Sequence, residues 1–141
     1  MAKLRHLALV VHDLERAKAF YEKLFDMKVA VEVKGTAVHL TDGVMNLALL
    51  DYKTVNRPGS KTADGREGLH HFGFRVGDLE ATQAAIEAAG GTYCFDFGDP
   101  NSMNYERKFT DPEGVLFDIS HKGWYGALDE TIETSPARAA E

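Results

Sequence analysis

The sequence has little of what several classes of protein require. Among its 141 residues the only cysteine is Cys94, which excludes an internal disulfide framework and a cysteine-rich zinc module and is typical of the reducing cytoplasm. The longest unbroken apolar run, at residues 7–11, is too short to cross a bilayer or to form the core of a signal peptide. The formal net charge is −6, so no broad basic face is available for nucleic acid. We therefore expect a cytoplasmic domain, without nucleic-acid or membrane partners, that acts on a small molecule or on another protein.

The chain contains an internal repeat. When His6 is laid over His71, HLALVVHDLERAKAFYE aligns with HFGFRVGDLEATQAAIE without a gap, and Asp13-Leu14-Glu15 falls on Asp78-Leu79-Glu80. A strand, a helix cap and a helix that all match are hard to obtain by chance. We therefore interpret the chain as two copies of one module.

Each copy predicts a strand, a helix and three further strands. Alternation over residues 6–11 and 71–76 places His6 and His71 on the face opposite the apolar side chains that pack on a helix. Asp13 and Asp78 are the predicted N-caps of the two helices. The further strands are predicted at 29–33, 36–41 and 44–50, the last two joined by a type I′ turn at Asp42-Gly43, and at 92–96, 103–109 and 115–120.

These elements predict an α+β fold, with two tandem βαβββ modules forming a curved mixed sheet around a concave ligand cleft. The composition, 44% hydrophobic and 27% charged, is that of a globular rather than a disordered chain. We expect a single domain over residues 1–125 and a tail at 126–141. Within the domain, module 1 spans about 3–52, a polar connector 53–67, and module 2 about 68–122.

The polar face of the predicted sheet carries a candidate metal site. His6 and His71 open the first strand of each module, and Asp118 points away from the helix layer because it alternates with Phe117 and Ile119. Two histidines and one carboxylate suit a divalent ion such as Fe(II) or Mn(II) and leave coordination positions open for substrate or water. The small residues Ala8 and Gly73, on the same face, are expected to leave room for a ligand.

Four further residues are candidates with an alternative structural role. His39 is a candidate catalytic base or simply an edge histidine, and Arg75 either neutralises an anionic substrate or pairs with a carboxylate of the sheet. Tyr105 and Arg107 alternate onto one face of their strand, where Tyr105 is a second catalytic candidate and Arg107 a substrate-binding candidate.

Three segments of the sequence resemble the vicinal oxygen chelate superfamily, which holds glyoxalase, bleomycin-resistance, fosfomycin-resistance and extradiol dioxygenase proteins. They are RHLALVVHDLERAKAFYEKLF, GLHHFGFRVGDLEATQAAIEAAGG and FTDPEGVLFDIS, and the resemblance covers nearly all of residues 4–122. It implies metal ligands at His6, His71 and Asp118, with His70 a rival to His71. The family's closing acid is usually glutamate, and a further ligand of its glyoxalases and epimerases falls in the strand at 44–50, where Asn46 is the only polar side chain.

The resemblance implies a divalent-metal-dependent enzyme, with Fe, Mn, Ni or Zn as cofactor, that acts on a small oxygen-bearing organic molecule by lyase, isomerase or transferase chemistry. The alternative is a non-catalytic binder that sequesters a drug or metabolite, as bleomycin-resistance proteins do. A homodimer is expected, because family members usually pair modules within or between chains. Ring-cleaving dioxygenase activity is not expected, since Lys108 stands where those enzymes carry a tyrosine.

Overall fold

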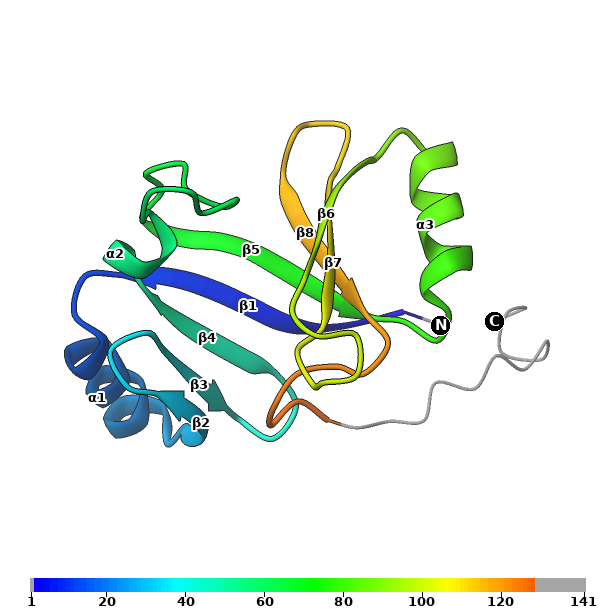
Figure 1. The fold of residues 1–141 in the computed structure, drawn as a ribbon. Coiled ribbons are helices and arrows are strands. Elements are labelled where there is room, and N and C mark those ends of the chain that lie inside the picture. The colour runs from blue at the N-terminus through cyan, green and yellow to red at the C-terminus, as the bar shows by residue number, and fades with distance from the viewer. Residues whose placement is uncertain (1, 129–141) are drawn as a thin grey trace.

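The computed structural model describes residues 2–128 of the chain, so most of the predicted tail, 129–141, lies outside the described residues. The elements are β1 (Lys3–Val11), α1 (Leu14–Phe25), β2 (Lys28–Val33), β3 (Ala37–Thr41), β4 (Asn46–Asp51), α2 (Tyr52–Val55), β5 (Gly68–Arg75), α3 (Leu79–Ala88), β6 (Thr92–Phe97), β7 (Glu106–Thr110) and β8 (Leu116–Ser120). They form two βαβββ modules, which confirms the predicted α+β class (Figure 1). None of the helices in the described part of the chain is long and apolar enough to span a membrane.

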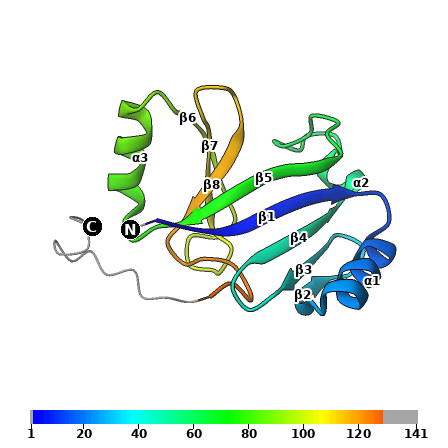
Figure 2. The same cartoon turned by 180° about the vertical axis from the view of Figure 1, so that it is seen from behind.

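The two modules share one eight-stranded mixed sheet, in the order β2-β3-β4-β1-β5-β8-β7-β6. Its centre is the antiparallel pair of β1 and β5, each of which also pairs in parallel with the last strand of its own module, β4 or β8. The sheet curves without closing, and the pair runs through the middle of the molecule (Figures 1 and 2). Because both central strands belong to one chain, His6 and His71 meet within that chain.

A separate apolar core supports each module on the helix side of the sheet. In module 1, Leu14 of α1 packs with Val38, Leu40 and Leu49. In module 2, Val76, Phe109 and Ile119 form the buried cluster, against which Leu79 and Ile86 of α3 pack. Burial of these side chains drives the folding of each half and leaves the concave face of the sheet available for polar groups.

The helix starts follow the sequence pattern, whereas one turn does not. Asp13 accepts a hydrogen bond from the backbone N–H of Arg16, and Asp78 accepts one from that of Ala81, as predicted for N-caps. The predicted type I′ turn at Asp42-Gly43 is wrong, because Gly43 has a positive φ of 95° and Asp42 does not. The loop is longer, and the Asp42 carboxylate accepts hydrogen bonds from the backbone N–H groups of residues 44 and 45.

Candidate metal site and ligand cavity

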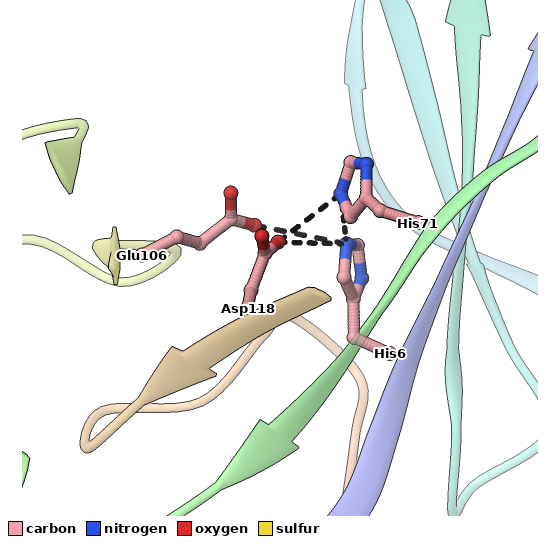
Figure 3. A group of neighbouring side chains, drawn as sticks. All are labelled: His6, His71, Glu106 and Asp118. Atoms are coloured by element: carbon pink, nitrogen blue, oxygen red, sulfur yellow. Dashed lines mark hydrogen bonds and ion pairs between the residues drawn. The ribbon is translucent and has the colours of Figure 1, made fainter. Parts of the chain in front are cut away.

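Four side chains converge on the concave face where the two modules meet. His6 comes from β1, His71 from β5, Glu106 from β7 and Asp118 from β8, and each offers one ligand atom within 4.8 Å of the others (Figure 3). The Nε2 atoms of the histidines are 3.1 Å apart, and Asp118 Oδ2 lies 3.1 Å from His71 Nε2 and 4.0 Å from His6 Nε2. Donors at about 2.0–2.3 Å from one ion are separated by distances of this size, so the cluster is compact enough for a single cation.

The register of the sheet explains why these residues meet. On β5, Gly73 lies opposite His6 of β1 on one side and opposite Asp118 of β8 on the other. On β7, Lys108 lies opposite Asp118. Side chains in one row across a sheet point to the same face, so the histidine, the carboxylate and the ammonium group are held side by side.

The Asp118 carboxylate tests whether the cluster fits a metal ion. Its Oδ1 accepts a hydrogen bond from Lys108 Nζ at 2.9 Å. Its Oδ2 is fully buried without a hydrogen-bond partner among the described residues, and it faces the Nε2 atoms of His6 and His71. A buried acceptor without a partner is costly, and a divalent cation at this point would satisfy it. The donor set of imidazole and carboxylate therefore fits a divalent transition metal.

Asn46 fixes the orientation of His6. The Asn46 Nδ2 group donates to the backbone carbonyl of Tyr125 at 2.8 Å, and a carbonyl can only accept, so this contact identifies the NH₂ end of the amide. The other end, Oδ1, then accepts from His6 Nδ1 at 2.7 Å. The proton of neutral His6 is consequently on Nδ1, and the lone pair on Nε2 faces the cluster. Asn46, in the strand where the resemblance places a further ligand of glyoxalases and epimerases, thus positions the candidate ligand His6.

His70 and His71 play different parts. The two rings meet through their Nδ1 atoms at 2.8 Å, which requires one of these nitrogens to carry a proton. His71 Nε2 belongs to the candidate metal-ligand cluster, whereas His70 Nε2 is buried without a hydrogen-bond partner among residues 2–128, 4.0 Å from Asp64 Oδ1. The structure therefore places His71 in the cluster and His70 behind it.

The charge state of the cluster favours metal binding. Burial lowers the pKa of both His6 and His71 to about 3, so both rings are neutral at pH 7. His6 presents its Nε2 lone pair, and the 3.1 Å hydrogen bond between the two Nε2 atoms therefore places the proton of neutral His71 on Nε2, so His71 would change tautomer on binding a metal. Burial opposes the charge of Lys108, but Glu106 and Asp118 outweigh it and raise the Lys108 pKa. Lys108 Nζ donates to Glu106 Oε2 at 3.0 Å as well as to Asp118 Oδ1. One buried ammonium group is thus shared by two carboxylates.

Trp124 completes the site, although nothing in the sequence pattern singled it out. Its indole ring stacks on the His6 imidazole with centroids 4.7 Å apart and an interplanar angle of 4°, and its Nε1–H donates to Glu106 Oε1 at 2.7 Å. A Cβ atom on Gly73 would lie 2.7 Å from this ring, so Trp124 fills the space that was expected to hold a ligand beside Gly73. At Ala8 the expectation agrees with the structure, because Ala8 lines the cavity.

A cavity of about 380 Å³ opens beside the cluster. This is within the usual size range of small-molecule sites. Its walls come from both modules and from the connector, and they include Ala8, Ala37, His39, Ala48, Leu50, Thr54, Val55, Arg57, His71, Phe97, Glu106 and Lys108. The connector therefore covers a cavity as well as joining the modules.

Of the remaining candidates, only His39 lies at the cavity. Arg107 binds Glu80 and Asp96 on the other face of the sheet, and the Tyr105 hydroxyl also donates to Asp96. Arg75 lies beside Gly123 and is not part of the cavity wall. The structure thus turns Glu106 and Lys108, rather than their neighbours, toward the site.

The comparisons with known proteins agree with this architecture. The family model for the Glyoxalase/Bleomycin resistance protein/Dioxygenase superfamily matches residues 3–119. Among curated proteins no match to the chain is found. A variant of the methylmalonyl-CoA epimerase from Streptomyces coelicolor, solved in complex with 2-nitronate-propionyl-CoA, is 26% identical with a TM-score of 0.65, over 83% of this chain and 94% of that chain.

Two more distant structures share the fold. The methylmalonyl-CoA epimerase from Mycobacterium tuberculosis is 21% identical with a TM-score of 0.64, over 98% of this chain and 91% of that chain. The Mn(II)-bound glyoxalase from Novosphingobium aromaticivorans is 19% identical with a TM-score of 0.64, over 92% of this chain and 42% of that chain. With the family match over residues 3–119, the chain belongs to the glyoxalase, bleomycin resistance and dioxygenase superfamily.

Proposed function

We propose that this chain is a divalent-metal-dependent enzyme that acts on a small oxygen-bearing organic molecule. The observation that carries the proposal is the buried Asp118 Oδ2 atom, which accepts no hydrogen bond from the described residues and faces the Nε2 atoms of His6 and His71. These three residues would hold the metal, with Glu106 close enough to be a fourth ligand. When bound, the metal supplies Lewis-acid polarisation of substrate oxygens.

The residues around the cluster support isomerase, lyase or transferase chemistry on a carbonyl-type substrate. The cavity admits a molecule of metabolite size and brings it to the ligand cluster. Burial raises the pKa of the Asp118 carboxyl and the Lys108 ammonium group opposes this rise, while Trp124 and Asn46 hold Glu106 and His6 in position. The likeness to an epimerase at 26% identity supports proton transfer beside a carbonyl group as the type of reaction.

A non-catalytic binding protein is the second candidate, and Lys108 is the observation that favours it. Its ammonium group already neutralises part of the charge of Glu106 and Asp118 at 3.0 and 2.9 Å. Because the Lys108 ammonium group already compensates these carboxylates, a metal ion would gain less electrostatic stabilisation from the cluster. In such a protein the same cavity would sequester its ligand unchanged.

Metal analysis separates these two functions. Protein purified without added metal and without chelator is expected to contain close to one equivalent of a transition metal per chain, measured by elemental mass spectrometry. Removal of the metal should lower the melting temperature by several degrees, because a ligand at 100 times its Kd stabilises a fold by about 2.7 kcal/mol. Metal-free protein whose melting temperature does not respond to Mn(II), Fe(II), Ni(II) or Zn(II) would favour the binding protein.

We further propose that the chain forms a homodimer in the cytoplasm. Phe20, Leu24 and Phe25 of α1 are 52%, 60% and 64% exposed, and a second copy of the chain would cover these apolar side chains. Cys94 is a free cysteine, which is typical of proteins in the reducing cytoplasm. Light scattering coupled to size exclusion at micromolar concentration is expected to give twice the mass of one chain. The mass of a single chain would contradict the dimer.

A further inference from the structure

The hydrogen bonds of Asn46 also determine the state of His39. The backbone carbonyl of Tyr125 identifies the Nδ2 end of the Asn46 amide, as described above. The same Nδ2 atom lies 3.0 Å from His39 Nδ1. Because an amide NH₂ group only donates, His39 Nδ1 must accept, and it therefore carries a lone pair and no proton.

The proton of His39 is then on Nε2. A neutral imidazole that accepts at one nitrogen carries its proton on the other. Burial lowers the pKa of His39, so the ring is neutral at pH 7. Among residues 2–128, His39 Nε2 makes no hydrogen bond. It is also not one of the fully buried polar atoms that lack a partner. His39 lies in the wall of the ligand cavity, where its strand pairs it with Ala48.

We propose that His39 is a hydrogen-bond donor to an oxygen atom of the substrate, through Nε2–H, and is not the general base of the reaction. This inference rests on the proposed function, since it assumes a substrate whose oxygens are held by a metal at His6, His71 and Asp118. The substrate class is accordingly one with an oxygen acceptor next to its chelating oxygens, such as a carbonyl or an enolate oxygen. A fixed donor of this kind stabilises negative charge that develops on oxygen.

One amide thus sets two rings in opposite tautomers. Asn46 accepts from His6 Nδ1 and donates to His39 Nδ1, so His6 presents a lone pair to the cluster while His39 presents a proton to the cavity. Aspartate at position 46 has the same shape but cannot donate from the second oxygen. It would therefore reverse the tautomer of His39 without enlarging the space between the rings.

The first experiment reads the tautomers directly in the metal-free protein. Two-bond ¹H–¹⁵N correlation spectra at pH 7.5, assigned with His39→Gln and His71→Gln, are expected to show His39 protonated at Nε2 and unprotonated at Nδ1. In Asn46→Asp the His39 proton should move to Nδ1. A proton on Nδ1 of His39 in the unmodified protein, or resonances averaged between the two tautomers, overturns the inference, whether or not Asn46→Asp folds.

The second experiment measures how tightly the Zn(II)-loaded protein binds acetohydroxamate, a small chelator that offers two adjacent oxygen atoms. His39→Leu is expected to weaken its binding about tenfold, the loss typical of one hydrogen bond to a charged group, while His39→Gln, which keeps an N–H donor, binds nearly as well as the unmodified protein. His39→Glu, which offers an acceptor, should bind worst. If His39→Leu binds the probe as tightly as the unmodified protein, the inference is wrong although the metal site stands. If Zn(II) does not bind at all, the proposed function fails, and the spectra alone decide the tautomer of His39.

Discussion

Replacing Lys108 with methionine is expected to lower the free energy of unfolding of the metal-free protein by about 3–5 kcal/mol, the usual cost of removing one partner from a buried ion pair. Lys108 is 2% exposed, and its Nζ atom bridges Glu106 and Asp118. Without it, two buried carboxylates face each other with no cation between them. Methionine keeps the length of the side chain, so the loss of charge rather than of packing dominates the effect.

A divalent metal should reverse most of this loss. In Lys108→Met the ion would become the only cation at the two carboxylates, so the variant is expected to gain more stability from added Mn(II) or Zn(II) than the unmodified protein does. Urea denaturation with metal and with chelator measures both effects. Lys28→Met, which removes a solvent-exposed pair with Asp26, is the control and should change neither value. Equal metal stabilisation of both proteins would show that Lys108 and the metal do not share these carboxylates.

His71→Gln is expected to weaken divalent-metal binding by more than about 100-fold, beyond the 10- to 100-fold losses typical of residues that only orient a ligand. Its Nε2 atom lies 3.1 Å from both Asp118 Oδ2 and His6 Nε2, so the cluster loses one of its two imidazole nitrogens. His71 is the better test because His6 stacks on Trp124, and His6→Ala would remove packing together with a ligand. His6 is buried and contributes packing as well as a candidate ligand atom.

Isothermal titration with Mn(II) and Zn(II), together with the metal content after dialysis, measures this loss. The matched control is His12→Gln, since His12 is an exposed histidine that pairs with Glu67 on the surface. Its metal affinity should equal that of the unmodified protein. A His71→Gln protein that binds metal as tightly as the control would remove His71 from the site and, with it, the proposed function.

The repeat is the reason that so much of the fold could be predicted. Matching His6 to His71 and Asp13 to Asp78 defined the start of each module, and the pairing of β1 with β5 follows the same correspondence. Hydrophobic alternation then gave the faces of the strands, because one face of a sheet must be buried. What this pattern could not supply was the turn between β3 and β4, whose geometry depends on hydrogen bonds from the Asp42 carboxylate.

Only part of the candidate site could be predicted from the sequence, for a physical reason. Glu106 and Lys108 alternate along a strand as charged residues on a solvated face do, and Tyr105 and Arg107 look more like binding residues. Only the pairing of β7 with β8, which sets Lys108 opposite Asp118, shows that the charged face is the buried one. Such long-range register is not encoded in local spacing. Trp124 was missed because it lies after the end of β8, outside any strand, and its ring reaches His6 over Gly73.

The register of the sheet also shows how the two halves of the duplication have diverged. Ala8 and Gly73 are equivalent in the repeat, and they lie opposite Ala48 and Asp118 in the parallel pairs of their modules. Ala48 therefore occupies in the first half the place that Asp118 occupies in the second. A carboxylate in one copy corresponds to a methyl group in the other.

The neighbouring strands repeat this contrast. His39 lies opposite Ala48, and Lys108 lies opposite Asp118, so a neutral ring in the first half corresponds to the buried ammonium group in the second. In this chain the charged groups Lys108 and Asp118 lie in the second half, and the equivalent places of the first half carry His39 and Ala48, which line the cavity. The two halves thus differ in charge at equivalent positions of one cavity, to which both contribute side chains.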